Sequence, residues 1–176
     1  MAKRAHLRAP AKVNLRLEVL GLRPDGYHEI RSWIYPVGLW DEIIVERTGG
    51  EFELLCDHPA VPREDLCLRA ARAFYQRTGL KGGARVVLKK RIPVGSGLGG
   101  GSSDAAATIK GLCALWGVEL SEEEILELGS QVGSDVPFFL RGRPALVGGR
   151  GERILEDLPP LKAFLIILFP GKGIST

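Results

Sequence analysis

A glycine-rich segment near the middle of the chain has the residue types and spacing with the clearest chemistry. Five glycines fall within residues 95–101, and Ser102 and Ser103 follow directly. Glycine adopts backbone conformations that other residues avoid, and it lets the chain approach a ligand closely. Because the segment lies between an expected strand and an expected helix, its N–H groups and the positive end of the helix dipole would converge on one concavity. The pattern therefore predicts a phosphate-binding loop.

The neighbours of this loop narrow its type without settling it. No Lys-Ser or Lys-Thr follows a glycine at the Walker A offset. Gly95, Gly97 and Gly100 match the G-x-G-x-x-G of a Rossmann site, but Pro93 interrupts the approach from the strand. A protein-kinase loop is excluded, because residue 102 is serine rather than valine and His-Arg-Asp and Asp-Phe-Gly do not occur. A flexible surface loop stays open as the alternative to phosphate binding.

Hydrophobic periodicity predicts an irregular mixture of strands and helices around the loop. A turn is expected at 23–26, and a capping box at Ser121 and Glu124 should begin a helix that breaks at 133–137. The other expected elements are a strand around 15–19, a hairpin of 41–46 with 51–56, helices at 66–77 and 105–116, and strands at 84–92, 145–147 and 163–168. This order favours an α+β fold over a regular βαβ array.

Composition limits the classes of protein that fit. The 176 residues are 45% hydrophobic with a formal net charge of +3, which is typical of a globular protein. That charge is too small to indicate nucleic-acid binding without a basic patch. The longest apolar run, residues 163–169, is far shorter than the ~20 residues of a membrane helix. Three cysteines without a pairing pattern favour a reducing compartment, so a cytoplasmic location is expected.

Residues 93–105 resemble the ATP-binding motif of the GHMP small-molecule kinases. Residues 9–15, 26–30 and 133–139 resemble further segments of the same family, in the same order along the chain. The triple glycine followed by two serines, together with Tyr-His at 27–28, is more specific than G-x-G-x-x-G alone. The resemblance implies a two-domain GHMP kinase whose N-terminal half is similar to ribosomal protein S5 domain 2.

The resemblance also implies an activity. The segments at 9–15 and 26–30 are similar to those of family members that transfer the γ-phosphate of ATP, with Mg²⁺, to the 2-hydroxyl of cytidylated methylerythritol. That reaction belongs to the non-mevalonate route to isoprenoid precursors. The expected partners are this small molecule and ATP, with no nucleic acid and no membrane. The alternatives are a homoserine- or mevalonate-type GHMP kinase, and a non-catalytic or Rossmann-type nucleotide-binding domain.

Five side chains outside the loop receive roles from the resemblance. Asp135 resembles the catalytic aspartate that takes the proton of the acceptor hydroxyl. Lys12 resembles the catalytic lysine, and a cation beside Asp135 would offset the charge that develops on the acceptor oxygen. Asn14 would lie on the same strand face as Lys12, and Tyr27 and His28 resemble the residues that hold the cytosine ring. Without the resemblance, these residues also fit a turn, a solvated lysine and a packed tyrosine.

The expected phosphate contacts run through the whole loop. They are Pro93, Val94, Gly95, Ser96, Gly97, Leu98, Gly99, Gly100, Gly101, Ser102 and Ser103. The metal ligands are unknown; Ser103 is a candidate by analogy with the Ser or Thr of other phosphate loops, and it is also a candidate N-cap. Asp65 stands where the family usually has asparagine, and an ionised aspartate cannot donate a hydrogen bond to adenine.

The end of the chain departs from the family pattern. Residues 1–160 are expected to form the N-terminal ATP-binding domain, and 161–176 a strand that leads into a second domain. That C-terminal domain is expected to be missing from this chain. The cleft between the two domains would then be incomplete, so the 176 residues alone need not be active.

Overall fold

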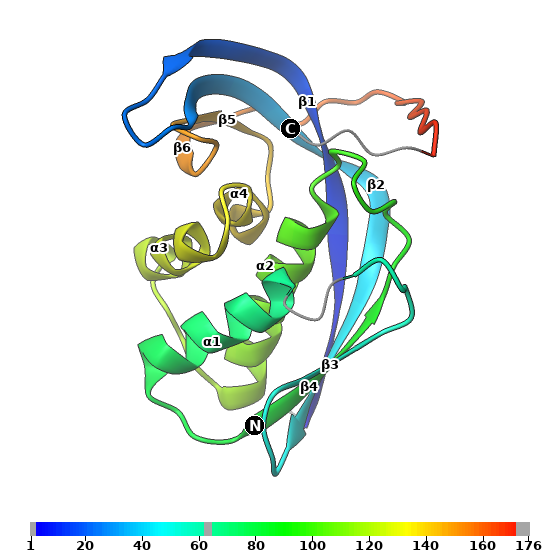
Figure 1. Cartoon of the computed structure of the whole chain (residues 1–176), viewed down its shortest axis with the longest axis vertical. Helices are drawn as coiled ribbons and strands as arrows, with labels where there is room; N and C mark the ends of the chain where they lie inside the picture. The colour runs from blue at the N-terminus through cyan, green and yellow to red at the C-terminus, as the bar shows by residue number, and fades with distance from the viewer. Residues whose placement is uncertain (1–2, 62–64, 172–176) are drawn as a thin grey trace.

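Two long strands form the spine of the fold in a computed structural model that describes residues 3–61 and 65–171. β1 (Arg4–Leu22) pairs antiparallel with β2 (His28–Thr48) along almost its whole length, and both strands curve at one end (Figure 1). The predicted turn between them is confirmed: the Gly26 N–H donates to the Arg23 carbonyl, and Gly26 has a φ of 83°. This hairpin gives the chain a continuous ladder on one edge of β2.

The other edge of β2 is divided between two strands. β4 (Gly83–Lys89) pairs antiparallel with residues 42–48, and β5 (Ala145–Gly148) pairs antiparallel with residues 32–34. Residues 35–41 lie between these two ladders, and Asp41 in this gap accepts hydrogen bonds from the backbone N–H groups of Arg91 and Ile92. The glycine-rich segment therefore leaves the sheet at the point where β4 ends beside β2.

The predicted hairpin of residues 41–46 with 51–56 is wrong. β3 (Glu53–Cys56) pairs in parallel with β4, which lies between β3 and β2. α1 (Leu66–Thr78) forms the crossover from β3 to β4, as parallel strands require. The turn residues at 49–50 indicate a reversal of the chain, but they do not indicate that a later strand enters between the two arms.

Three of the four helices begin or end on predicted signals. α1 is capped by Asp65 and ends at Gly79 in a left-handed conformation, close to the predicted 66–77. The predicted capping box of Ser121 and Glu124 is present at the start of α3 (Glu122–Val132). α2 (Gly100–Trp116) begins five residues before the predicted Ala105, because glycines that disfavour an isolated helix join its first turn once it is packed.

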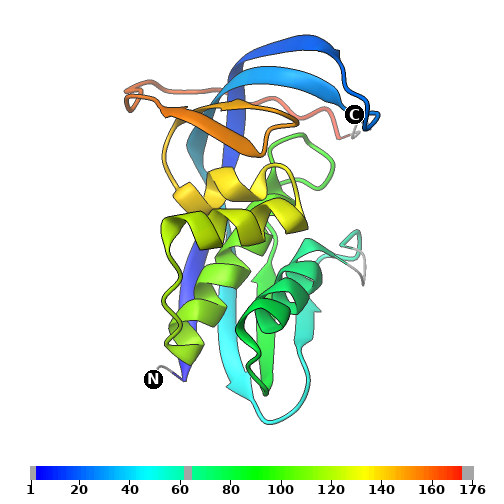
Figure 2. The same cartoon turned by 90° about the vertical axis from the view of Figure 1, so that its left-hand side faces the viewer.

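Two short elements follow α3 that the sequence did not predict. α4 (Val136–Arg141) occupies the expected helix break, and β6 (Arg153–Asp157) pairs antiparallel with the predicted strand β5. Both elements are too short for periodicity to separate them from loops. α4 lies beside the β5–β6 hairpin at one end of the domain (Figure 2), which brings residue 135 close to the turn at 149–151.

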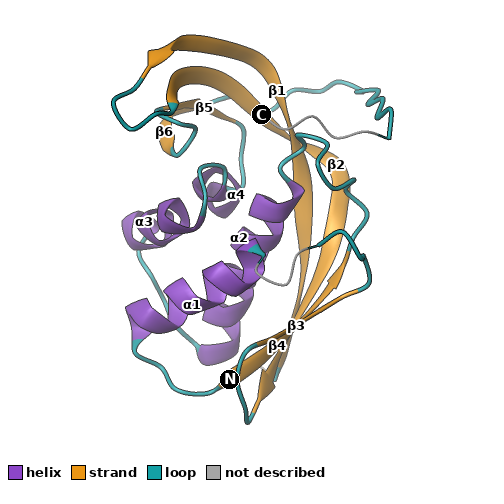
Figure 3. Ribbon diagram, viewed as in Figure 1, coloured by secondary structure: helices purple, strands orange, loops and turns teal. Residues whose placement is uncertain are grey.

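The helices lie on one face of the sheet, with α2 at the centre (Figure 3). α2 packs against β1, β2, α1 and α4, and its buried residues include the small Ala105, Ala106 and Ala107. Gly111 has no room for a side chain, because a Cβ there would overlap the side chain of Val45. Small residues thus let α2 approach the sheet closely, which fixes the glycine loop at its N-terminus against the strands.

The predicted strand at 163–168 is absent, and residues 158–170 are irregular. The side chains of Phe164, Ile166 and Leu168 are exposed, although the segment runs beside residues 35–39 of β2. An apolar alternating run becomes a strand only where a neighbour completes its hydrogen bonds, and no such ladder forms in the part of the chain that the structure describes. None of the helices within residues 3–61 and 65–171 is long and apolar enough to cross a membrane.

Replacing Gly83 by alanine is expected to lower the free energy of unfolding by about 1–3 kcal/mol. The reason is that a methyl group on buried Gly83 would overlap the carbonyl oxygen of Gly50, which is backbone and cannot move aside. Gly50→Ala is the matched control, since a Cβ at Gly50 meets nothing within 4 Å. Urea unfolding of both variants measures the difference, and equal stabilities would contradict the close approach.

Candidate active site: a phosphate loop beside a lysine–aspartate pair

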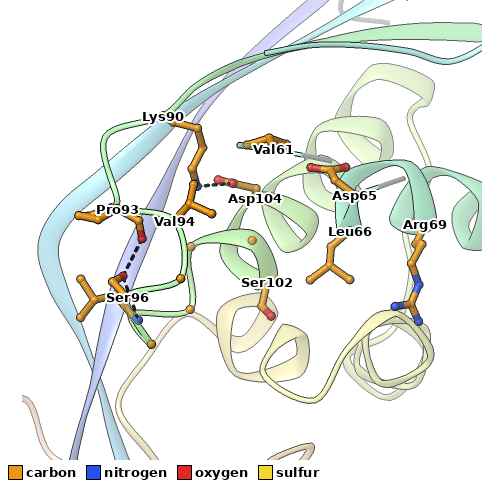
Figure 4. Close-up of a pocket in the computed structure, with 16 residues that line it drawn as sticks. Val61, Asp65, Leu66, Arg69, Lys90, Pro93, Val94, Ser96, Ser102 and Asp104 are labelled. Atoms are coloured by element: carbon orange, nitrogen blue, oxygen red, sulfur yellow. Dashed lines mark hydrogen bonds and ion pairs between the residues drawn. The ribbon is translucent and has the colours of Figure 1, made fainter. Parts of the chain in front are cut away.

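The glycine-rich loop is shaped by left-handed glycines. Gly95, Gly97 and Gly99 have φ values of 73°, 75° and 73°, a region that side chains disfavour. Ser96 stabilises the turn, because its hydroxyl donates to the Pro93 carbonyl at 2.7 Å (Figure 4). Gly99 is the N-cap of α2 and supplies no side-chain hydrogen bond to the helix. The N–H groups of the first turn therefore stay available for an anion.

A pocket of about 370 Å³ opens over this loop. Its lining includes the predicted phosphate contacts from Pro93 to Ser102, and it is closed on the other side by the start of α1. The remaining lining residues are Val61, Asp65, Leu66, Arg69, Lys90 and Asp104. The pocket thus combines an anion-binding floor with an apolar and charged wall, which suits a phosphorylated ligand with a flat organic group.

Ser103 is not the N-cap that the sequence suggested. It is the fourth residue of α2, and its N–H donates to the Gly99 carbonyl at 2.9 Å, so the N-cap prediction was wrong. Its hydroxyl is buried without a hydrogen-bond partner and is not part of the pocket lining. Ser103 as a metal ligand or phosphate contact stays a prediction.

Asp65 faces the loop from the far wall of the pocket. One of its carboxylate oxygens accepts hydrogen bonds from the N–H groups of Cys67 and Leu68, at 2.8 and 3.2 Å, and so caps α1. Burial raises the pKa of this carboxyl group, while these hydrogen bonds act in the opposite direction. Asp65 therefore caps α1 as an asparagine at this position would, because both residue types are good N-caps.

Lys12 and Asp135 meet directly behind the loop. The Lys12 Nζ lies 3.6 Å from an oxygen of Asp135, although the residues are far apart in the sequence. The backbone N–H of Lys12 donates to the Leu98 carbonyl at 2.9 Å, which ties β1 to the loop. Asp135 is the residue before α4, but its side chain makes no cap hydrogen bond, so its carboxylate is not used by the helix.

A chain of hydrogen bonds orients the lysine. Its Nζ donates to Asn14 Oδ1 at 2.6 Å, and the Asn14 amide donates to the Ser32 hydroxyl at 2.6 Å. Ser32 in turn donates to the Arg16 carbonyl at 2.7 Å. Asn14 thus lies beside Lys12 as the strand spacing predicted, and buried Ser32 is a supporting residue that the sequence analysis missed because it lies on a different strand.

Tyr27 and His28 lie at the tip of the β1–β2 hairpin. The turn at 149–151 lies between this tip and Asp135 and contacts both regions. Ile30 donates to the Gly149 carbonyl at 2.8 Å. A Cβ on Gly151 would lie 3.5 Å from an Asp135 oxygen. The Arg150 guanidinium, which the sequence did not single out, covers the Tyr27 ring at 4.7 Å.

A buried charge cluster beneath the loop was also missed. The Lys90 Nζ donates to Asp41 at 2.5 Å and to Asp104 at 2.8 Å (Figure 4). The side chains of all three residues are at most 4% exposed. Lys90 and Asp104 could have been singled out from the sequence, because they flank the glycine-rich loop. Asp41 could not, because it lies in β2, far from the loop in the sequence.

The cluster places two carboxylates around one ammonium group in a site that excludes water. Burial raises the pKa of Asp104 to about 8, because desolvation outweighs the attraction of Lys90. For Lys90, burial acts to lower the pKa, but the charge of Asp104 and the hydrogen bonds to both carboxylates leave it raised. Lys90 therefore stays protonated, and within residues 3–61 and 65–171 it is the only cationic side chain that pairs with either carboxylate.

Comparison with known proteins decides the family to which this arrangement belongs. Residues 65–143 match the model of the GHMP kinases N terminal domain, and a curated protein of Gloeobacter violaceus, named 4-diphosphocytidyl-2-C-methyl-D-erythritol kinase, is 45% identical over 168 residues. The chain contains a GHMP kinase N-terminal domain. The predicted family and the predicted α+β fold of its N-terminal domain are thereby confirmed.

Solved structures of GHMP kinases agree with this assignment. A crystal structure of 4-(cytidine 5'-diphospho)-2C-methyl-D-erythritol kinase has a TM-score of 0.73 and 44% identity, covering 88% of this chain and 55% of that one. The mevalonate kinase of Methanococcus jannaschii shares the fold at 19% identity, with a TM-score of 0.65 over 89% of this chain and 56% of its own. The Gloeobacter alignment covers 94% of this chain and 55% of the relative, so the chain spans about half the length of the curated relatives it matches.

Proposed function

We propose that the protein containing this chain phosphorylates the 2-hydroxyl of 4-diphosphocytidyl-2-C-methyl-D-erythritol with ATP, a step in the non-mevalonate route to isoprenoid precursors. The observation that carries the proposal is the Lys12–Asp135 pair, at 3.6 Å, tied to the phosphate loop through the Lys12–Leu98 hydrogen bond. A carboxylate beside a cation, next to a phosphate site, is what transfer to an alcohol requires. The names of the relatives supply the acceptor.

The proposed reaction assigns one role to each group. Asp135 accepts the proton of the acceptor hydroxyl as its oxygen bonds to the γ-phosphorus. The bond from the γ-phosphorus to the β–γ bridging oxygen breaks, and ADP leaves with that oxygen. Lys12 stabilises the negative charge near Asp135 and the transferred phosphoryl group, while Asn14 and Ser32 hold its ammonium group in place.

The loop fits the phosphates of ATP. It offers free N–H groups at the start of α2, and a Cβ on Gly97 would meet nothing within 4 Å, so the backbone is open to a ligand. Mg²⁺, when bound with ATP, would neutralise charge on the phosphates. No group of three or more His, Cys, Asp and Glu is placed to hold a metal within the described ranges, so the phosphates themselves and water would supply most ligands of this ion.

The acceptor would extend from Asp135 toward the hairpin tip. Tyr27 is 54% exposed, and Arg150 lies over its ring, so a cytosine ring could stack on this pair and a diphosphate could approach the guanidinium. His28 would supply a hydrogen bond to the base. We further propose a cytoplasmic enzyme, on the strength of the cysteine usage described above, with small molecules as its ligands.

A homoserine- or mevalonate-type kinase is the second candidate. Such kinases share the fold, but this chain is 19% identical to the mevalonate kinase of Methanococcus jannaschii, against 44% for the 4-(cytidine 5'-diphospho)-2C-methyl-D-erythritol kinase. The exposed Tyr27 beside Arg150 also has no evident use for an acceptor without a nucleobase. A Rossmann-type domain is disfavoured, because the glycine loop follows a strand that is antiparallel to its central neighbour.

ADP release by the full-length protein tests the proposal across a panel of acceptor alcohols. With ATP and Mg²⁺, the expected result is rapid ADP release with 4-diphosphocytidyl-2-C-methyl-D-erythritol and background release with homoserine and mevalonate. Turnover with either of the latter alone would favour the second candidate. NADH binding without ATP binding would overturn the kinase assignment.

A further inference from the structure

We propose that Lys90 is a positioning residue of the nucleotide site, which fixes the glycine-rich loop and neutralises the buried carboxylates that lie beneath its phosphates. The inference rests on the proposed function, since it concerns how the same loop binds ATP. It assigns no chemical step to Lys90, because its ammonium group is engaged by Asp41 and Asp104 and its side chain is only 4% exposed.

The first observation is that Lys90 joins three segments that are distant from one another in the sequence. Its ammonium group binds Asp41 of β2 and Asp104 of α2, and Lys90 itself is the residue that follows β4. Asp41 also accepts the backbone N–H groups of Arg91 and Ile92, which lead into the loop. One lysine thus connects the start of the loop, the helix that ends it and the central strand.

The second observation is that the ammonium group abuts the loop itself. A Cβ built on Gly100 would lie 3.0 Å from the Lys90 Nζ, so the first residue of α2 rests on this side chain. Gly100 and Gly101 are the residues whose N–H groups point toward the anion site at the helix start. A displaced Lys90 would therefore displace the donors that hold phosphate.

The third observation is electrostatic. Asp41 and Asp104 are buried carboxyl groups at a site built to bind a polyanion, and a negative charge there opposes phosphate binding. Lys90 is the cation placed between them. Without it, at least Asp41 would present an uncompensated charge to the phosphates from within a low-dielectric region. Loss of the ammonium group should therefore weaken ATP binding by more than its packing contribution alone.

Equilibrium titration of the full-length protein with ATP, without the acceptor alcohol, tests this inference. Lys90→Met keeps the length of the side chain but removes the charge, and it is expected to raise the Kd for ATP at least about tenfold. Lys89→Met is the matched control, because Lys89 is the exposed neighbour at the end of β4, and its Kd should match that of the wild type.

The double variant Lys90→Met with Asp41→Asn separates charge from structure. It removes one positive and one negative charge, so the formal charge of the cluster returns to that of the wild type. Both backbone N–H groups bind the same oxygen of Asp41, which asparagine retains. We expect its Kd to return to within about threefold of the wild-type value, because the opposing charge is gone.

The outcomes are distinct. A Kd for Lys90→Met that equals the wild-type value, or a double variant as impaired as Lys90→Met, overturns the inference and leaves the kinase proposal standing. Wild-type protein that does not bind ATP at all overturns the proposed function and this inference with it. If Lys90→Met alone does not fold, the double variant still decides: a Kd near that of the wild type supports the inference, and a weakened one contradicts it.

Discussion

Replacing Asp135 by asparagine is expected to lower kcat by about 10²–10⁴-fold. Asparagine keeps the size and the position of the side chain, but it cannot accept the proton of the acceptor hydroxyl. The Asp135 side chain caps no helix, so the substitution should leave the fold intact. Steady-state kinetics of the full-length enzyme with ATP and the cytidylated acceptor measure the effect, and KM for ATP should change little by comparison.

Asp157→Asn is the control for this experiment. Asp157 is a surface aspartate of β6 whose carboxylate pairs with Arg141 rather than with Lys12. Its loss should leave kcat close to the wild-type value. If Asp135→Asn also retains wild-type kcat, Asp135 is not the proton acceptor, and the mechanism proposed for the Lys12–Asp135 pair is wrong.

Gly99→Ala is expected to lower kcat/KM by about a hundredfold or more. The reason is that moving a catalytic or substrate-positioning group by about 1 Å can slow the reaction by about this factor. Gly99 has a φ of 73°, and a Cβ there would lie 2.9 Å from the Phe139 ring and 3.0 Å from the Lys12 Cγ. The added methyl group must therefore move the loop, the lysine or both. Kinetics with varied ATP and varied acceptor show which substrate is affected.

Gly97→Ala provides a matched comparison within the same loop. Gly97 has a similar φ of 75°, but a Cβ there meets nothing within 4 Å. Both variants share the cost of an alanine in the left-handed region, which is about 1–2 kcal/mol. Only Gly99→Ala also crowds Lys12. Equal losses in the two variants would show that backbone strain, and not the contact with Lys12, explains the requirement for glycine.

The parts of the site that local sequence could predict are those carried by contiguous motifs. The loop at 93–102 lines the pocket, and the segments around Lys12 and Asp135 place these two side chains together. Helices α1 and α3 were predictable because their caps lie next to them in the sequence. For the loop and for these helices, the determining interactions occur within a few residues of the element. Lys12 and Asp135 are far apart in the sequence, and only the family resemblance predicted that they act together.

The parts that failed depend on distant partners. Asp41 and Lys90 are separated by 49 residues, and only the insertion of β4 beside β2 brings them into contact. The same insertion overturned the predicted hairpin of β2 with β3. The N-cap prediction for Ser103 failed because α2 begins at Gly100, so the serine lies within the helix and Gly99 is the N-cap.

The central claim is that the loop and the Lys12–Asp135 pair transfer a phosphoryl group from ATP to an alcohol. Mass spectrometry of the product, with ATP whose γ-phosphate carries heavy oxygen, tests it most directly in the full-length protein. The account predicts that 4-diphosphocytidyl-2-C-methyl-D-erythritol gains one phosphoryl group, with its three non-bridging oxygens heavy and the acceptor oxygen unlabelled. Labelled inorganic phosphate with an unmodified acceptor would contradict it, because the protein would then hydrolyse ATP without transferring the phosphoryl group to the alcohol.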